Sequence, residues 1–96
     1  MKEFRITKQG LRELKKLSKS NPNMVNRIGN VIQNIRRGEK IGGTLQVYTE
    51  FRKVRVGKYR LIHTEIDQIV IIAIIEKRET VYDTFSHLLK NSNFLN

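Results

Sequence analysis

The sequence contains no cysteine, which excludes disulfide bonds and metal sites built on thiolates. It has only two histidines, His63 and His87, which lie far apart in the chain. Neither has a second ligand at the helical or hairpin spacing that is typical of metal sites. We therefore expect this protein to hold no metal ion and no cofactor.

Long apolar segments are also missing. The longest apolar run, Ile69–Ile75, is far too short to span a bilayer and is typical of a buried strand. The chain begins with MKEFRITK, which is charged and lacks the apolar region of a signal peptide. No basic amphipathic helix with an aromatic apolar face stands out, so a membrane surface is the weaker kind of partner. We expect a cytoplasmic protein with no membrane partner.

Acidic residues are scarce. Nine Asp and Glu stand against 19 Lys and Arg, which gives a formal net charge of +10 and an isoelectric point near 10.3. Self-repulsion on this scale favours a polyanionic partner: a nucleic acid, a ribosomal surface or an acidic protein. The 96 residues are enough for a single domain, 1–96, with one core.

The first part of the chain carries the patterns of one strand and two helices. Residues 2–6 alternate like a strand, and Thr7 is a suitable N-cap for a first helix. Asn21 and Pro22 form the N-cap and first-turn pair of a second helix, which Gly38 can end in a left-handed conformation. The expected apolar stripes are Leu11, Leu14 and Leu17 on the first helix, and Met24, Ile28, Val31 and Ile35 on the second.

The residues after Gly38 are typical of a sheet followed by a helix. Strand-like runs cover 44–56, 59–66 and 69–75. Glu76, Lys77 and Arg78 are expected to leave the core. A last helix is expected to begin near Val81, with Thr80 and Asp83 as its capping pair. The residues expected to dock this helix are Val81, Phe85 and Leu88 or Leu89. The tail 91–96 is expected to fray. The sequence thus predicts an α+β fold: an N-terminal strand and a helical hairpin packed on a small, mainly antiparallel four-stranded sheet, with a short C-terminal helix.

The stretch Phe51–Arg60, FRKVRVGKYR, predicts a β-hairpin with a basic face. Gly57-Lys58 forms the turn, because Gly57 can supply the positive φ that a tight connection needs. The expected pairs are Val56 with Tyr59, Arg55 with Arg60, Val54 with Leu61, and Lys53 with Ile62. Alternation then places Lys53, Arg55 and Arg60 on one face. Opposed arginines destabilise a sheet, so either an anionic ligand or simple solvation of a charged face accounts for them.

Arg78 and Tyr82 are the further candidates for this basic face. Arg78 follows the predicted central strand, and Tyr82 lies one helical turn later. Together with Lys53, Arg55 and Arg60 they lack paired carboxylates, a Ser/His/Asp triad and a metal cluster, but they suit metal-free phosphodiester chemistry. Arginines bind phosphate oxygens and stabilise the transition state, the RNA 2′-hydroxyl can serve as the nucleophile, and Tyr82 offers a stacking face.

The segments FRKVRVGKYRLIH and EKRETVY, with the order of the elements over nearly the whole chain, resemble the RelE/ParE toxin superfamily, and more closely its RelE-like mRNA interferase branch. This resemblance implies that the protein cleaves mRNA in the ribosomal A site and is silenced by a small acidic antitoxin. It also implies partners in mRNA and ribosomal RNA. The residues that match the family's RNA-cleaving site are Lys53, Arg55, Arg60, Arg78 and Tyr82.

Several alternatives stay open beside this interpretation. The ParE branch shares the fold but inhibits DNA gyrase, and an inactive relative would only bind RNA or an antitoxin. Lys58 and Lys77 are basic neighbours that either contact RNA or are solvated. His63 stands where many relatives have a tyrosine, and alternation places it on the core side as a packed histidine. We expect His87, on the last helix, to lie at the surface.

Overall fold

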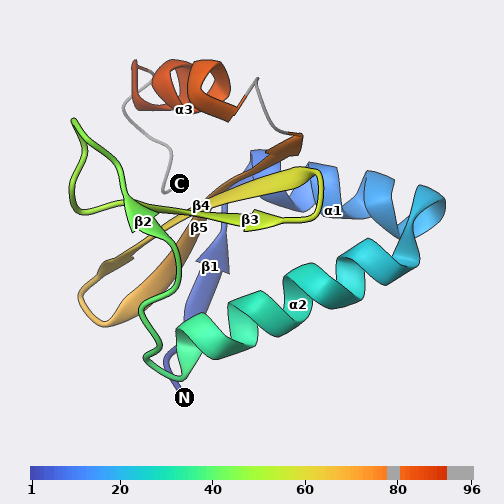
Figure 1. Cartoon of the computed structure of the whole chain (residues 1–96), viewed down its shortest axis with the longest axis horizontal. Helices are drawn as coiled ribbons and strands as arrows, with labels where there is room; N and C mark the ends of the chain where they lie inside the picture. The colour runs from blue at the N-terminus through green and yellow to red at the C-terminus, as the bar shows by residue number, and fades with distance from the viewer. Residues whose placement is uncertain (78–80, 91–96) are drawn as a thin grey trace.

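The computed structural model shows a five-stranded sheet with helices on both faces (Figure 1). It describes residues 1–77 and 81–90, except for the side chain of Tyr82. The capping role of Thr80 and the fraying of 91–96 therefore lie outside the described residues. The elements in chain order are β1 (Phe4–Ile6), α1 (Lys8–Ser20), α2 (Pro22–Arg36), β2 (Gly43–Thr44), β3 (Arg52–Val56), β4 (Tyr59–Ile66), β5 (Ile69–Lys77) and α3 (Val81–Lys90).

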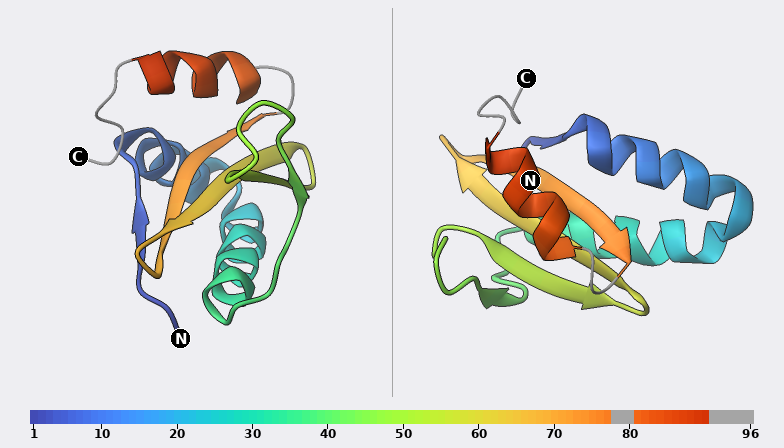
Figure 2. Two further views of the ribbon diagram at one scale, coloured as in Figure 1. Left: turned by 90° about the vertical axis from the view of Figure 1, so that its left-hand side faces the viewer. Right: turned by 90° about the horizontal axis from the view of Figure 1, so that it is seen from above.

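The strand order is β1-β5-β4-β3-β2. Only the β1–β5 pair is parallel, and the other three pairs are antiparallel. The helices α1 and α2 lie on one face of the sheet, and α3 lies on the other (Figure 2). The predicted α+β class, helical hairpin and C-terminal helix are confirmed, but the sheet has five strands instead of four.

The extra strand arises because the predicted strand 44–56 is interrupted. After β2 the chain forms a loop over 45–51, in which the Leu45 amide donates to the Phe51 carbonyl and the Phe51 amide donates to the Tyr48 carbonyl, both at 3.0 Å. Leu45 and Phe51 are buried, whereas Val47 between them is 80% exposed. The two ends of the loop thus enter the core while its tip stays outside, a pattern that resembles a strand in sequence.

Each face of the sheet has its own apolar cluster. The prediction that Leu11 belongs to the buried stripe of α1 is wrong, because this side chain is 47% exposed. The helix-face cluster comprises Leu17, Met24, Ile28, Ile32, Ile35, Val56, Tyr59, Leu61, Val70, Ile72 and Ile75. The α3-face cluster comprises Leu45, Phe51, Ile62, Ala73, Ile74, Val81 and Phe85.

The predicted helix ends are confirmed. The Thr7 hydroxyl accepts from the Gly10 amide at 3.2 Å, and the Asn21 side chain accepts from the Met24 amide at 3.2 Å. Each cap satisfies an amide that lacks a partner within its own helix. Gly38, just past α2, has a φ of +96°, the left-handed conformation that ends the helix.

A β-bulge interrupts the interior strand β5. Ile62 pairs with Ile74 and His63 pairs with Ile72, so Ala73 has no partner on β4. The Ala73 carbonyl instead accepts a hydrogen bond from the Thr7 hydroxyl at 2.6 Å. The extra residue reverses the alternation of side chains in the rest of β5.

Strand β5 continues to Lys77, two residues beyond the predicted end at Ile75. Glu76 and Lys77 leave the core as predicted, since Glu76 is half-buried and Lys77 is exposed. Glu76 lies opposite Arg60 on the α3 face, and Lys77 lies opposite Tyr59 on the helix face. The free edge of β5 is closed by Gln9, whose side-chain amide donates to the Ile75 carbonyl at 2.8 Å and accepts from the Ile75 amide at 3.0 Å. Strand β1 pairs with β5 only from Val70 to Ile72, so beyond that point the Gln9 side chain takes the place of backbone pairing.

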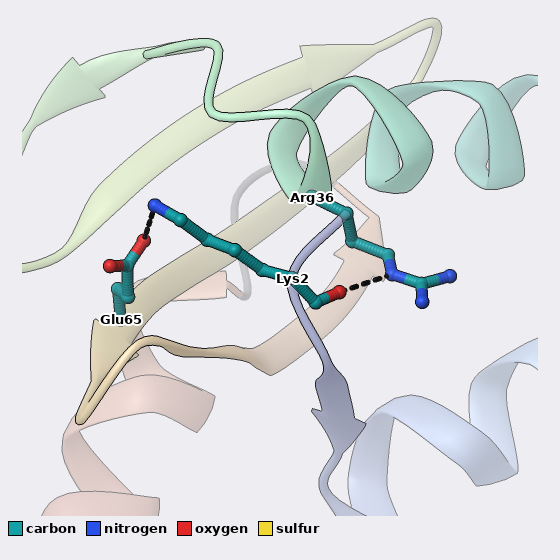
Figure 3. Close-up of polar contacts among 3 residues, drawn as sticks. All are labelled: Lys2, Arg36 and Glu65. Atoms are coloured by element: carbon teal, nitrogen blue, oxygen red, sulfur yellow. Dashed lines mark hydrogen bonds and ion pairs between the residues drawn. The ribbon is translucent and has the colours of Figure 1, made fainter.

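Lys2 joins the N-terminus to α2 and β4 (Figure 3). Its amide donates to the Arg36 carbonyl at 2.9 Å, and Arg36 Nε donates to the Lys2 carbonyl at 2.8 Å. Lys2 Nζ also forms an ion pair with Glu65 at 2.7 Å. Both charged side chains are about two-fifths exposed, so we expect little stability from this pair.

Replacing Gly42 with alanine is expected to lower the free energy of unfolding by about 1–3 kcal/mol. Gly42 has a φ of +89°, and an added Cβ would lie 2.3 Å from the Lys53 carbonyl oxygen. Gly29→Ala is the matched control, because nothing lies within 4 Å of its added Cβ and α2 gains a better helix former. We expect Gly29→Ala to stabilise by about 0.5–1 kcal/mol. Urea unfolding followed by circular dichroism measures both, and equal stabilities would contradict the packing at Gly42.

Candidate functional site

The β3–β4 hairpin has the predicted register. The pairs are Val56 with Tyr59, Arg55 with Arg60, Val54 with Leu61, and Lys53 with Ile62. Gly57 has a φ of +61°, as the turn requires. A Cβ on Gly57 would lie 2.8 Å from Met24 Cε and 3.2 Å from Arg27 Nη1, so the turn packs closely against α2.

The hairpin separates apolar from basic side chains as predicted. Val56, Tyr59 and Leu61 are buried in the helix-face cluster. Arg55 and Arg60 oppose each other on the α3 face of the sheet, and Lys53 shares that face because it pairs with Ile62 of the α3-face cluster. Arg55 is exposed, whereas Lys53 and Arg60 are partly exposed. We call Lys53, Arg55 and Arg60 the basic triplet.

The two arginines of the basic triplet make few contacts of their own. Arg55 Nε donates to the Gly57 carbonyl at 3.3 Å, and Arg60 Nη1 donates to the Tyr59 carbonyl at 3.4 Å. Both hydrogen bonds are long. Within residues 1–77 and 81–90, no carboxylate forms an ion pair with either arginine. Their donors are therefore available to an anion.

Glu76 is a site residue that the sequence analysis missed. It pairs with Arg60 across β4 and β5, so Arg60 lies between Arg55 on one side and Glu76 on the other. Glu76 Oε2 accepts a hydrogen bond from Thr84 Oγ1 of α3 at 2.5 Å. Glu76 thus links α3 to the sheet beside Arg60. The local sequence carries no signal for this position, because the bulge at Ala73 decides which face Glu76 occupies.

The other two predicted RNA-binding residues are Lys58 and Lys77. Lys58 is exposed in the hairpin turn. Lys77 lies on the helix face, with its ammonium group 6.0 Å from the centre of the Tyr59 ring. Burial, with a smaller contribution from the negative charge of Glu13, raises the pKa of the Tyr59 hydroxyl.

The second half of the predicted site lies mostly outside the described residues. Arg78 is not described, and for Tyr82 only the backbone is described, in the first turn of α3. The neighbours Val81 and Phe85 are 1% and 2% exposed, so this turn is docked on the α3 face as predicted. That Arg78 and Tyr82 join the basic triplet stays a prediction.

His63 is a packed histidine on the helix side of the sheet, as alternation predicted. It is 4% exposed, and its Nε2 donates to the Ile41 carbonyl at 3.0 Å. Burial lowers the pKa of His63; the hydrogen bond to Ile41 opposes this effect, and the nearby charge of Arg52 adds to it. The predicted surface position of His87 is also confirmed.

Acidification is expected to destabilise the protein through His63. In the unfolded chain its pKa returns to about 6.5, so the unfolded state binds more protons than the folded state between that value and the lower folded pKa. The contribution to stability is therefore complete above the unfolded pKa and is lost as the pH falls through the folded pKa. His63→Gln, which keeps an N–H donor for Ile41, should flatten this dependence, whereas His87→Gln should retain it. Urea unfolding at pH 5 and pH 7.5 measures the slopes, and parallel slopes for wild type and His63→Gln would contradict the assignment.

The described residues also bear on metal and membrane binding. Among them, no three His, Asp or Glu side chains gather closely enough to hold a metal ion. No helix in the described part of the chain is long and apolar enough to cross a membrane.

Sequence comparison places this geometry in a known family. A family model described as the ParE toxin of the type II toxin-antitoxin system, parDE, matches residues 4–82. The chain belongs to the ParE toxin family. The match runs from β1 into the first turn of α3 and includes the whole basic hairpin. No curated protein is significantly similar in sequence.

Solved toxins share the fold at low sequence identity. The isolated E. coli RelE toxin is 18% identical, with a TM-score of 0.71 over 96% of this chain and 99% of its own. The YoeB dimer from Staphylococcus aureus is 23% identical, with a TM-score of 0.69 over 79% of this chain and 95% of its own. A YoeB-YefM complex from the same organism is 22% identical, with a TM-score of 0.67 over 81% of this chain and 98% of its own. The predicted RelE/ParE superfamily is confirmed, and this ParE-family protein is a toxin of the type II kind with the RelE/YoeB fold.

Proposed function

We propose that this toxin is an endoribonuclease that cleaves mRNA in the ribosomal A site without a metal ion. The observation that carries the proposal is the opposed pair Arg55 and Arg60 on the α3 face, which no described carboxylate neutralises by an ion pair. Opposed like charges lower the stability of a sheet, and an anion bound between the two arginines would offset their repulsion. A phosphodiester matches the bidentate donors of arginine.

The proposed reaction uses the nucleophile that RNA carries. The 2′-hydroxyl attacks the adjacent phosphorus and loses its proton, the bond from phosphorus to the 5′-oxygen breaks, and the leaving oxygen takes up a proton. The products are a 2′,3′-cyclic phosphate and a 5′-hydroxyl end. Arg60 and Arg78 stabilise the charge on the phosphoryl oxygens, and Lys53 and Arg55 assist proton transfer or balance charge. Tyr82 stacks against or orients a base.

The proposed partners follow from charge. With a net charge of +10, the toxin is suited to mRNA and ribosomal RNA, and to a small acidic antitoxin that would neutralise it. Lys58 and Lys77 would contribute to the RNA contacts from the hairpin turn and from the helix face. The complex of a YoeB relative with YefM supports an antitoxin partner for this toxin as well. We propose that it acts in the cytoplasm.

Mapping mRNA 5′ ends after incubation with translating ribosomes tests the proposal. New 5′-hydroxyl ends at A-site codons are the expected result. The matching family model carries the ParE name, so a gyrase supercoiling assay is run in parallel. Intact mRNA with inhibited supercoiling would overturn the proposal in favour of a gyrase inhibitor. RNA binding with a steep salt dependence but no cleavage would overturn it in favour of an inactive binder.

A further inference from the structure

A groove opens beside Lys53, between the 45–51 loop and α3. Its volume is about 690 Å³, within the usual size of small-ligand sites. Gln46, Val47 and Tyr48 line it from the loop, and Phe85 and Ser86 line it from α3. In two views of the structure the loop between β2 and β3 rises from the sheet toward α3 (Figures 1 and 2).

The groove presents apolar surface that folding does not explain. Val47 is 80% exposed and Tyr48 is 38% exposed, although both line the groove together with the buried Phe85. The Tyr48 ring packs edge-on against Phe85, with ring centres 5.4 Å apart, and Phe85 packs against Phe51 at 4.9 Å. The exposed Tyr48 ring is thus held by the buried ring of Phe85, which in turn packs against the buried ring of Phe51. Such a preorganised aromatic surface is suited to a flat ligand.

We propose that this groove binds an unpaired nucleobase of an RNA strand whose backbone phosphates lie along β3; this inference rests on the proposed function for the choice of RNA. Lys53 lines the groove and is also the first member of the basic triplet. Lys53 and Arg55 are two residues apart on β3, which separates them by about 7 Å. This distance is comparable to the separation of successive phosphates in a single strand. A strand held by both residues therefore has one base next to the groove.

The lining residues match the chemistry of a nucleobase. Tyr48 offers an aromatic ring, on which any base can stack. Gln46 carries both a donor and an acceptor for a base edge, and the Ser86 hydroxyl supplies either. Among the described residues that line the groove none is acidic, and Lys53 makes it cationic where a phosphate would enter. The combination of stacking, edge recognition and a phosphate contact favours a nucleotide over a purely apolar ligand.

The test uses the full-length toxin and a short single-stranded RNA whose 2′-hydroxyls are methylated, so that binding is measured without cleavage. Tyr48→Ala is expected to weaken binding about tenfold, in line with the loss of one stacked base. Tyr48→Phe keeps the ring and should bind like wild type. Ile66→Ala is the matched control, because Ile66 is also 38% exposed but lies at the far end of β4 from the hairpin turn. Gln46→Ala should leave overall affinity within a few fold but change the preference among bases.

Abasic probes show whether Tyr48 acts through the base. Removing one base from the RNA should weaken wild-type binding about tenfold and leave Tyr48→Ala unchanged, because the two changes remove the same contact. Additive losses would overturn the inference. The inference would also be overturned if the wild-type toxin did not bind RNA, or if a synthetic acidic peptide occupied the groove and RNA did not. If the methylated RNA binds with this base dependence while unmodified mRNA stays intact, the groove stands and the proposed cleavage fails. If unmodified mRNA is cleaved but Tyr48→Ala does not weaken RNA binding, the proposed cleavage stands and the inference about the groove fails.

Discussion

Arg60→Ala is expected to reduce mRNA cleavage by about 10²–10³-fold, the usual cost of removing a preorganised donor from a transition state. Arg60 lies between Arg55 and Glu76 in the middle of the sheet, and its own hydrogen bond to the Tyr59 carbonyl is long. The guanidinium is therefore positioned by the sheet while its donors remain available to a phosphate. Cleavage rates of a ribosome-bound mRNA under single-turnover conditions measure the effect.

Stability separates a catalytic role of Arg60 from a structural one. Arg60→Ala removes the repulsion from Arg55 and also the attraction to Glu76 across the other strand pair, so the free energy of unfolding should change by no more than a few tenths of a kcal/mol. Arg60→Lys keeps the charge but loses the planar fork of donors, and should cleave at an intermediate rate. Arg37→Ala is the control for net charge, because Arg37 is exposed after α2 and its guanidinium donates a hydrogen bond only to Asn34 among the described residues. Equal cleavage by wild type and Arg60→Ala would refute the assignment.

Phe85→Ala is expected to lower the free energy of unfolding by about 3–5 kcal/mol, the typical cost of truncating a buried phenylalanine. Phe85 is 2% exposed and lies in the α3-face cluster, where it contacts the rings of Phe51 and Tyr48. Phe85 thus anchors α3 on the sheet. A domain of this size has a total stability of about 5–15 kcal/mol, so the loss should appear as a large fall in both the melting temperature and the urea midpoint.

Loss of Phe85 should also reduce cleavage, because Tyr82 belongs to the same helix and Glu76 is tied to it through Thr84. The comparison is Phe4→Ala on β1. Phe4 is 37% exposed, and its ring lies 4.5 Å from the Arg36 guanidinium, so its truncation should cost about 1 kcal/mol. If Phe85→Ala and Phe4→Ala have the same unfolding midpoint, the docking of α3 through Phe85 is wrong.

The parts of the fold that the sequence predicted well are governed by local chemistry. Thr7 and Asn21 cap their helices because each side chain reaches an amide three residues away. Asp67 and Gln68 form the predicted turn with φ values of +51° and +66°, the tight type that joins β4 and β5. Such contacts involve neighbours in the chain, so their signal lies in a few adjacent residues.

The predictions that failed depend on contacts between residues that are far apart in the chain. Leu45 and Phe51 both enter the core and both lie in a strand-like run, yet they are the two ends of a loop that packs under α3. Leu11 continues the apolar stripe of α1 but belongs to neither apolar cluster and stays exposed. An apolar pattern shows which residues favour burial, but it does not show whether another element is present to cover them.

The basic hairpin itself is the clearest case of what the sequence determines alone. The glycine turn fixes the register, and the two-residue period of a strand then sets which side chains share a face, so Lys53, Arg55 and Arg60 follow from local rules. The surroundings of that face were decided only by tertiary structure. The bulge at Ala73, whose carbonyl binds a threonine 66 residues earlier, turns Glu76 toward Arg60 and Lys77 away from it. One extra residue in a strand reverses every side chain after it, and only contacts across the sheet determine where that residue is placed.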